Sequence, residues 1–473
     1  MSDLPPAPPP SPAVDAGVPS GRARCAVVGL AVALVLLLGY AVLAARASAA
    51  LDARTRVIVE EGALWNTRSK ARPPLLGEPA DGDAVAHYFA LEHALGGRAD
   101  WGGQPPAGTA PALTAPIQAP NALATLEAAL AALREGAAPA PEAQDLLARL
   151  APLRGHVGEG LRRREVDWRT DLREGFGASV PYLFAYRATA FALACEAARA
   201  PAPAEAVERA LEVVLLGRDL EHGDTLIGRM IGVSLRRIGH EALAHALGRA
   251  AGDPAALRRA LETLGQVEPR SLRGTIEGER VAMLIELARL TGRDSGGRRP
   301  EFAPSYEGPT RWLGPVVFAR EWDLLEAFYA ELAPACELPA HARGAAALAA
   351  QERAVAPWSV ITRLAVPDFA RALQQVAAVD VEASLVRAAA AALLARHERG
   401  AWPPAADAFA AAGVEAKDPF RPDGAAFGLR ADDDGGLTLW SVGPDGKDDG
   451  GAPTKKGEDA GDLVVRVVPA GAR

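Results

Sequence analysis

The chain has only three cysteines in 473 residues, too few for a disulfide scaffold. Cys25 lies in an apolar run, whereas Cys195 and Cys336 either pair in an oxidising compartment or remain two buried thiols. Aromatic residues make up only 5% of the sequence, so a core must come mainly from Ala, Leu and Val. This composition favours helices packed through small side chains over a β-sandwich, and the length suits two or three domains.

The chain also lacks an excess of positive charge. Its net charge of −8 argues against a nucleic-acid-binding protein. Most of the negative charge lies near the C-terminus, because residues 418–462 carry eleven acidic and five basic side chains. The remainder is nearly neutral, with the arginine and glutamate pattern expected of solvated helix faces.

Recognisable catalytic motifs are absent as well. There is no G-x-S-x-G, phosphate-binding Walker loop, dinucleotide-binding glycine fingerprint or C-x-x-C pair. The segment HEALAH places His240 and His245 five residues apart, about 140° around a helix, whereas a zinc protease needs a spacing of four. We therefore predict His240 at the surface, His245 at the edge of the core, and a protein that is not an enzyme. A hydrolase built from scattered Glu, Asp and His residues is the alternative.

An apolar run at residues 25–45 contains no charged side chain. A helix of that length spans about 30 Å, the thickness of the hydrocarbon core of a bilayer. Cleavage near Ala47–Ala49 would make the run a signal peptide, but signal peptides have shorter apolar regions. We predict one uncleaved transmembrane helix in the cytoplasmic membrane, preceded by a disordered Pro-rich tail at residues 1–24. Basic residues flank both ends, so the placement of residues 46–473 outside the cytoplasm depends mainly on the C-terminal resemblance.

Residues 46–376 are predicted to form an irregular α-helical bundle or array that binds a protein partner. No sustained heptad or fixed repeat is present. A long Gly/Pro-rich loop is expected at residues 96–120. Hydrophobic spacing predicts helices near residues 81–95, 122–134, 141–150, 180–198, 204–220, 225–249, 254–264, 270–290, 319–332 and 345–354.

The predicted helix 225–249 shows the pattern most fully. Its three- and four-residue steps predict a buried stripe made of Ile227, Ile231, Leu235, Ile238, Ala242 and His245. Its other side is predicted to meet water through Arg229, Arg236, Arg237 and His240.

Residues 377–473 are predicted to form a helix followed by a small antiparallel β-module. The helix covers residues 381–399 and ends before Gly400. Strands are expected at residues 426–430, 437–442 and 463–468, with the Asp/Gly-rich ADDDGG as a hairpin turn between the first two. The loop before the third strand gathers many carboxylates, which repel one another unless water or a cation such as Ca²⁺ neutralises them.

The order of helix, GAWP, DPF, hairpin, SVGPDG and Asp-rich loop resembles the periplasmic part of the type II secretion major pseudopilin. That family binds calcium in this loop. The resemblance implies a calcium site with Asp445 and Asp462 as ligands, Asp459 as a further ligand and Ser441 at the start of the loop. The alternative is a solvated acidic turn without a metal.

The chain departs from that family at its N-terminus. Pseudopilins carry a short basic leader followed by GFTLIE-like residues, and neither is present here. The resemblance therefore implies a borrowed calcium-stabilised module, attached to a helical region like that of large bacterial membrane-anchored proteins. We expect a single-pass, envelope-facing binding protein. The alternative within this class is a component or docking partner of a type II secretion system.

Overall fold

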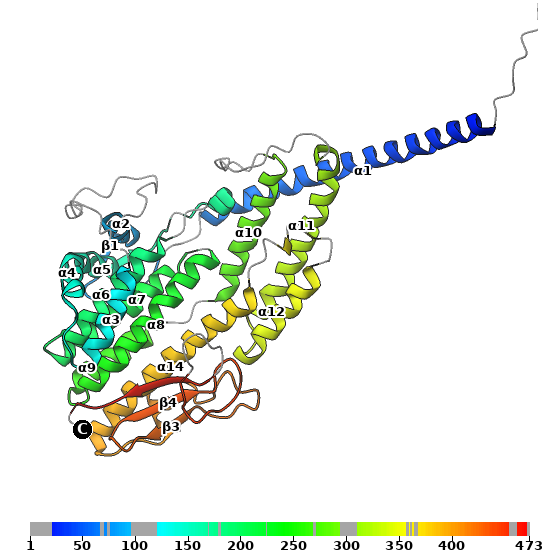
Figure 1. The fold of residues 1–473 in the computed structure, drawn as a ribbon. Helices are drawn as coiled ribbons and strands as arrows, with labels where there is room; N and C mark the ends of the chain where they lie inside the picture. The colour runs from blue at the N-terminus through cyan, green and yellow to red at the C-terminus, as the bar shows by residue number, and fades with distance from the viewer. Residues whose placement is uncertain are drawn as a thin grey trace, which may run out of the picture.

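The computed structural model describes residues 21–66, 71–72, 76–95, 121–168, 170–177, 181–223, 225–267, 271–293, 310–355, 359, 362–363, 368–453 and 461–470. Over these residues the protein is mainly helical, with a small three-stranded sheet near the C-terminus (Figure 1). Most of the predicted N-terminal tail and all of the predicted loop at 96–120 lie outside the described residues.

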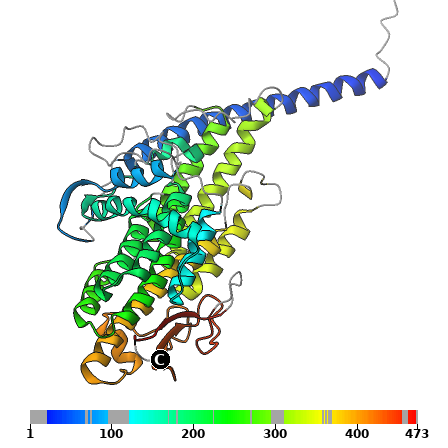
Figure 2. The ribbon, with the colours of Figure 1, turned by 60° about the vertical axis from the view of Figure 1, so that its left-hand side comes forward.

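The first helix, α1 (Gly21–Asn66), is far longer than the predicted membrane span. Its N-terminal half projects away from the rest of the protein (Figures 1 and 2), with Val35 70% exposed and Leu38 69% exposed. Its C-terminal half packs against the protein through Leu51, Ile58 and Trp65, which are all buried. Among the described helices, α1 alone is long and apolar enough to cross a membrane, as a membrane anchor or a signal sequence would be.

After α1 the chain forms a series of helices and a two-stranded parallel sheet, which are the first part of the helical body. Strand β1 (Ala80–Asp83) pairs with β2 (Arg163–Glu165). The helices of this part are α2 (Val85–Ala94), α3 (Ala122–Arg134), α4 (Pro141–Leu150), α5 (Arg154–Leu161), α6 (Leu183–Arg199), α7 (Pro203–Leu220), α8 (Leu226–Arg249) and α9 (Pro254–Gly265).

The chain then forms α10 (Leu272–Leu290), α11 (Thr310–Ala335), α12 (Ala340–Ala354) and the long α14 (Phe369–Arg399). Helices α10 and α11 pack on α1, and α12 packs on α11 and on α14. Phe328 and Tyr329 of α11 contact Phe369 at the start of α14, and these helices share one apolar core. A second apolar core contains residues of helices α2 through α9, of the C-terminal part of α14 and of the three-stranded sheet near the C-terminus. The predicted boundary between residues 376 and 377 therefore falls inside α14, which contributes to both cores.

Glycines allow α7 and α8 to approach at backbone distance. A Cβ at Gly232 would lie 2.5 Å from the carbonyl oxygen of Gly217, and one at Gly239 would lie 2.7 Å from the backbone nitrogen of Val214. Both distances are too short for a real Cβ atom, so these positions of α8, which lie against α7, must be glycines. This pair is the most extensive helix contact among the described elements.

The predicted orientation of α8 is wrong at several positions. Ile227, expected in the core, is 58% exposed, whereas Arg229, Arg236 and His240, expected in water, are buried. The physical reason is that α8 contacts α6, α7 and α14 and so buries most of its circumference. Arginines on such a helix must be paired with carboxylates, because a buried unpaired charge is strongly unfavourable. His245 is half-buried, as predicted.

A buried ion network supplies those partners. Glu221, directly after α7, is 1% exposed and lies 2.8 Å from Arg218, 3.0 Å from Arg236 and 3.5 Å from Arg229. Arg236 also forms a 2.8 Å ion pair with Asp380 of α14. Burial opposes ionisation of Glu221, but the guanidinium groups outweigh it and lower the pKa of Glu221 to about 2. The network therefore joins α7, α8 and α14 in the interior.

Both described cysteines are free and buried. Cys195 belongs to α6 and Cys336 directly follows α11, so of the two alternatives the structure has two separate thiols. Burial raises the pKa of Cys195 to about 12 and that of Cys336 to about 11. Both therefore act as small apolar groups in the core.

Candidate metal centre

The predicted acidic loops lie on the three-stranded sheet at the end of α14. Strands β3 (Gly428–Ala431), β4 (Leu437–Ser441) and β5 (Leu463–Val467) pair antiparallel in the order β3-β4-β5, close to the predicted strands. Helix α14 ends before Gly400, whose φ of 75° satisfies the expected helix stop. After α14, the short helix α15 (Ala405–Ala411) leads to the DPF segment. Trp440 lies opposite Gly428 in the sheet, where a Cβ would be only 2.0 Å from the indole ring.

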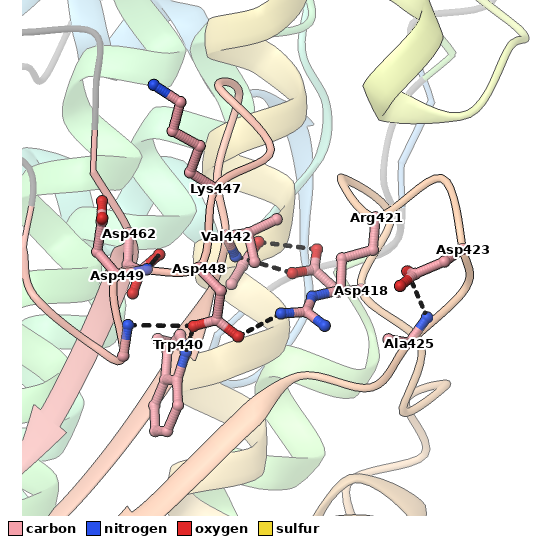
Figure 3. Close-up of polar contacts among 12 residues, drawn as sticks. Asp418, Arg421, Asp423, Ala425, Trp440, Val442, Lys447, Asp448, Asp449 and Asp462 are labelled. Carbon is pink, nitrogen blue, oxygen red and sulfur yellow. Dashed lines mark hydrogen bonds and ion pairs between the residues drawn. The ribbon is translucent and has the colours of Figure 1, made fainter.

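Asp418 of the DPF segment organises the end of β4, a role that the sequence analysis did not assign. Its carboxylate is 2% exposed and accepts a 2.8 Å hydrogen bond from the hydroxyl of Ser441 and a 2.9 Å bond from the N–H of Val442 (Figure 3). The same carboxylate accepts the N–H of Phe420 at 3.0 Å. The hydroxyl proton of Ser441 is therefore directed to Asp418, and Ser441 closes the DPF segment onto the sheet.

Asp462, one of the predicted ligands, is buried, at 1% exposed. Its two oxygens accept the N–H of Asp449 at 3.2 Å and the N–H of Gly451 at 2.6 Å. Burial, together with the nearby charges of Asp448 and Asp449, raises the pKa of Asp462 although these N–H groups lower it. A cation placed beside Asp462 would stabilise its ionised form, which would offset the effects of burial and of the nearby charges of Asp448 and Asp449.

Asp445 lies in the same loop and faces the segment that precedes β5. Its Oδ1 accepts the N–H of Lys447 at 3.1 Å, and its Oδ2 accepts the N–H of Gly461 at 3.4 Å. Asp445 accepts the N–H of Gly461, and Asp462 follows Gly461 in the sequence, so two of the predicted ligands adjoin the same glycine. Each oxygen of Asp445 uses one lone pair for its N–H donor, which leaves capacity for a hard cation.

Asp448 has a different function in this loop. It accepts a 3.1 Å hydrogen bond from the indole N–H of Trp440 and forms an ion pair with Arg421 (Figure 3). The indole bond, then the N–H of Gly450 and the charge of Arg421 lower the pKa of Asp448 despite some desolvation. The side chain of Lys447 extends away from these carboxylates (Figure 3). Asp448 thus fixes the loop to β4 and lies outside the predicted ligand set.

The donor chemistry of this loop fits Ca²⁺ in part. Asp445 and Asp462 supply carboxylate oxygens on a loop of several glycines, and backbone carbonyls are the further ligands that calcium accepts. Asp459 lies outside the described residues. Within the described part of the chain, no three His, Cys, Asp or Glu side chains are already gathered as a metal site. Of the predicted metal ligands that the structure describes, Ser441 is the least supported, because its hydroxyl donates a hydrogen bond to Asp418.

Comparison of the chain with protein-family models, curated proteins and solved structures finds no match.

Proposed function

We propose that the chain is a single-pass membrane protein. Its helical body binds a protein partner on the extracytoplasmic side, and Ca²⁺ stabilises its pseudopilin-like C-terminal module. The observation that carries the membrane assignment is the exposed apolar half of α1. A run of valines and leucines 49–70% exposed over Leu30–Leu43 forms a larger apolar surface than a soluble monomer presents to water. Lipid is the environment that suits it.

The body would sit close to the membrane, because α1 continues into it without a break. Near the end of the predicted span, the backbone oxygen of Ser48 accepts a 3.1 Å hydrogen bond from Arg293 of the body. Arg293 also pairs with Asp52 at 2.7 Å, and Arg54 pairs with Asp323 at 2.8 Å. Ser48 lies three residues after the predicted span ends, so these contacts support a body held at a fixed angle to the bilayer.

Extraction and protease accessibility test the membrane assignment. The full-length chain should remain in the membrane pellet after alkaline carbonate extraction. Replacing Leu36 and Leu38 by arginine should release it, since each centrally placed arginine costs about 2.5 kcal/mol or more for insertion. Arginine at Val57, an exposed position in the body-packed half, is the matched control and should leave anchoring unchanged. Protease added to spheroplasts, in which the outer face of the cytoplasmic membrane is accessible, should digest the body; protection there would reject the orientation.

Calcium-dependent protection of the sheet tests the C-terminal proposal. In the full-length protein, Ca²⁺ should slow hydrogen exchange of β4 and residues 443–453 relative to chelator, through preferential binding to the folded loop. Asp445→Ala should abolish that difference. The control Asp433→Ala removes an exposed aspartate in the β3–β4 turn and should preserve it. A calcium effect that survives Asp445→Ala would reject Asp445 as a ligand. If Ca²⁺ has no effect on the natural sequence, calcium binding is rejected and the loop is a solvated acidic turn.

A further inference from the structure

A groove opens where the helical body meets the β-module. Its volume is about 560 Å³, within the size range of small-molecule sites. The end of α3, one face of α8, Glu382 of α14 and the segment from β5 to Ala470 surround it. Its apolar lining consists of Ala244, Val464, Val465, Val468, Pro469 and Ala470. Of the predicted metal ligands that the structure describes, none lines this groove.

The polar lining contains buried donors without acceptors. His240 is only 3% exposed, and neither of its ring nitrogens has a hydrogen-bond partner. Its Nδ1 lies 3.7 Å from the Oε2 of Glu382, beyond hydrogen-bond length. On the other wall, Arg134 bonds Glu241 through Nη1 at 3.1 Å, while its Nε and Nη2 are buried and unpartnered. Such donors are unfavourable in a folded protein unless a ligand or water supplies acceptors.

The charge of the lining favours an anion. Four guanidinium groups face two carboxylates around the groove. Burial lowers the pKa of both histidines and so favours their neutral form, in which each ring has one N–H donor and no charge. Arg237 is held by Glu382 at 3.0 Å, and Arg249 donates to carbonyl groups at the end of α6. Arg466 pairs with Asp432 and Asp434, which do not line the groove. Arg134 is therefore the cation whose remaining N–H groups point to an additional acceptor.

We propose that this groove binds a small organic carboxylate with a short apolar chain. Arg134 and His240 donate to the carboxylate oxygens, and the apolar residues of β5 and the C-terminal segment contact the hydrocarbon. An arginine–carboxylate pair is a strong, charge-assisted contact in such a partly enclosed site. The groove contains no Ser, Thr, Cys or Tyr among its lining residues, so the site binds a ligand without an evident nucleophile. The ligand would join α8 to the β-module.

Titration of the full-length protein in a lipid nanodisc with hexanoate tests this proposal. Hexanol and hexylamine serve as uncharged and cationic analogues, and inorganic phosphate as an anion without a chain. Hexanoate should bind and slow hydrogen exchange in the C-terminal part of α8 and in residues 463–470, whereas the three other probes should bind at least about tenfold more weakly. Equal binding of hexanol would overturn the carboxylate assignment. Equal binding of phosphate would overturn the proposal that the groove recognises the hydrocarbon chain of its ligand.

Two variants locate the site independently. Arg134→Met removes the guanidinium group but keeps an unbranched apolar side chain, and because Arg134 is partly exposed it should fold; hexanoate affinity should fall about tenfold or more. His240→Gln retains a donor and should reduce affinity less. The matched control Arg258→Met removes an exposed arginine of α9 and should change nothing. Unchanged affinity in folded Arg134→Met, or no hexanoate binding by the natural sequence at millimolar concentration, would reject the proposal.

Discussion

Replacing Glu221 by glutamine tests the buried ion network directly. The substitution keeps the size of the side chain but removes the only carboxylate that contacts all three of Arg218, Arg229 and Arg236 among the ion pairs described. Arg236 would retain Asp380, whereas Arg218 and Arg229 would lose this negative partner. Because the guanidinium groups are nearly inaccessible to water, solvent cannot compensate for the lost charge.

Two routes give the expected magnitude. Removing one partner of a buried ion pair typically costs about 3–5 kcal/mol. Independently, the pKa of Glu221 falls from 4.5 to about 2 on folding, which corresponds to about 3–4 kcal/mol. Since folding lowers this pKa, the stabilisation is fully present above pH 4.5 and is lost as the pH falls through 2. The two estimates agree.

The assay is denaturant unfolding of the full-length protein in mild detergent, followed by circular dichroism between pH 7 and pH 2. Glu221→Gln should be about 3 kcal/mol less stable than the natural sequence at pH 7, and the difference should shrink toward pH 2. The control is Glu398→Gln, whose partner Arg258 lies at 3.1 Å in an exposed pair worth at most about 1 kcal/mol. If the two variants lose the same stability, or if the difference is independent of pH, the network does not stabilise the fold as argued.

Other substitutions and one labelling experiment test the remaining contacts. Gly232→Ala should lower stability by about 1–3 kcal/mol or more in the same unfolding assay, because its Cβ would lie 2.5 Å from a backbone oxygen of α7; Gly252→Ala, with open space around it, should not. Asp418→Asn should cost about 1–3 kcal/mol and speed hydrogen exchange at the end of β4, because an amide group replaces one of two accepting oxygens. Cys195 and Cys336 should resist alkylation at pH 8 in the folded protein and react after unfolding, as read by mass spectrometry; rapid native labelling would contradict their burial.

The helices and the terminal sheet could be predicted because their signals are local. Pro203 and Pro254 stand in the first turns of α7 and α9, and the capping side chain of Thr225 precedes α8, so these helix starts follow from neighbouring residues. The hairpin likewise follows from alternating apolar residues on both sides of an Asp/Gly turn. The start of α14 was predicted twelve residues too late, although a local signal is present, because the side chain of Asp368 caps the helix by accepting the N–H of Arg371.

The buried charges could not be predicted, because their partners are distant in sequence. Arg236 bonds Glu221, 15 residues away, and Asp380, 144 residues away. A helical projection of α8 alone assigns arginine to water, and only the packing of α7 and α14 shows that these side chains are enclosed. The same applies to Ser441, whose hydroxyl donates to Asp418, 23 residues distant in sequence.

Helix α14 has a further consequence for how the chain tolerates insertions and deletions. Each residue added to a helix turns everything beyond it by about 100° and moves it by about 1.5 Å. A single insertion midway along α14 would therefore rotate the packing surface used by one core out of phase with the other. Only length changes close to whole turns, such as seven residues, would keep both surfaces in phase to within about 20°.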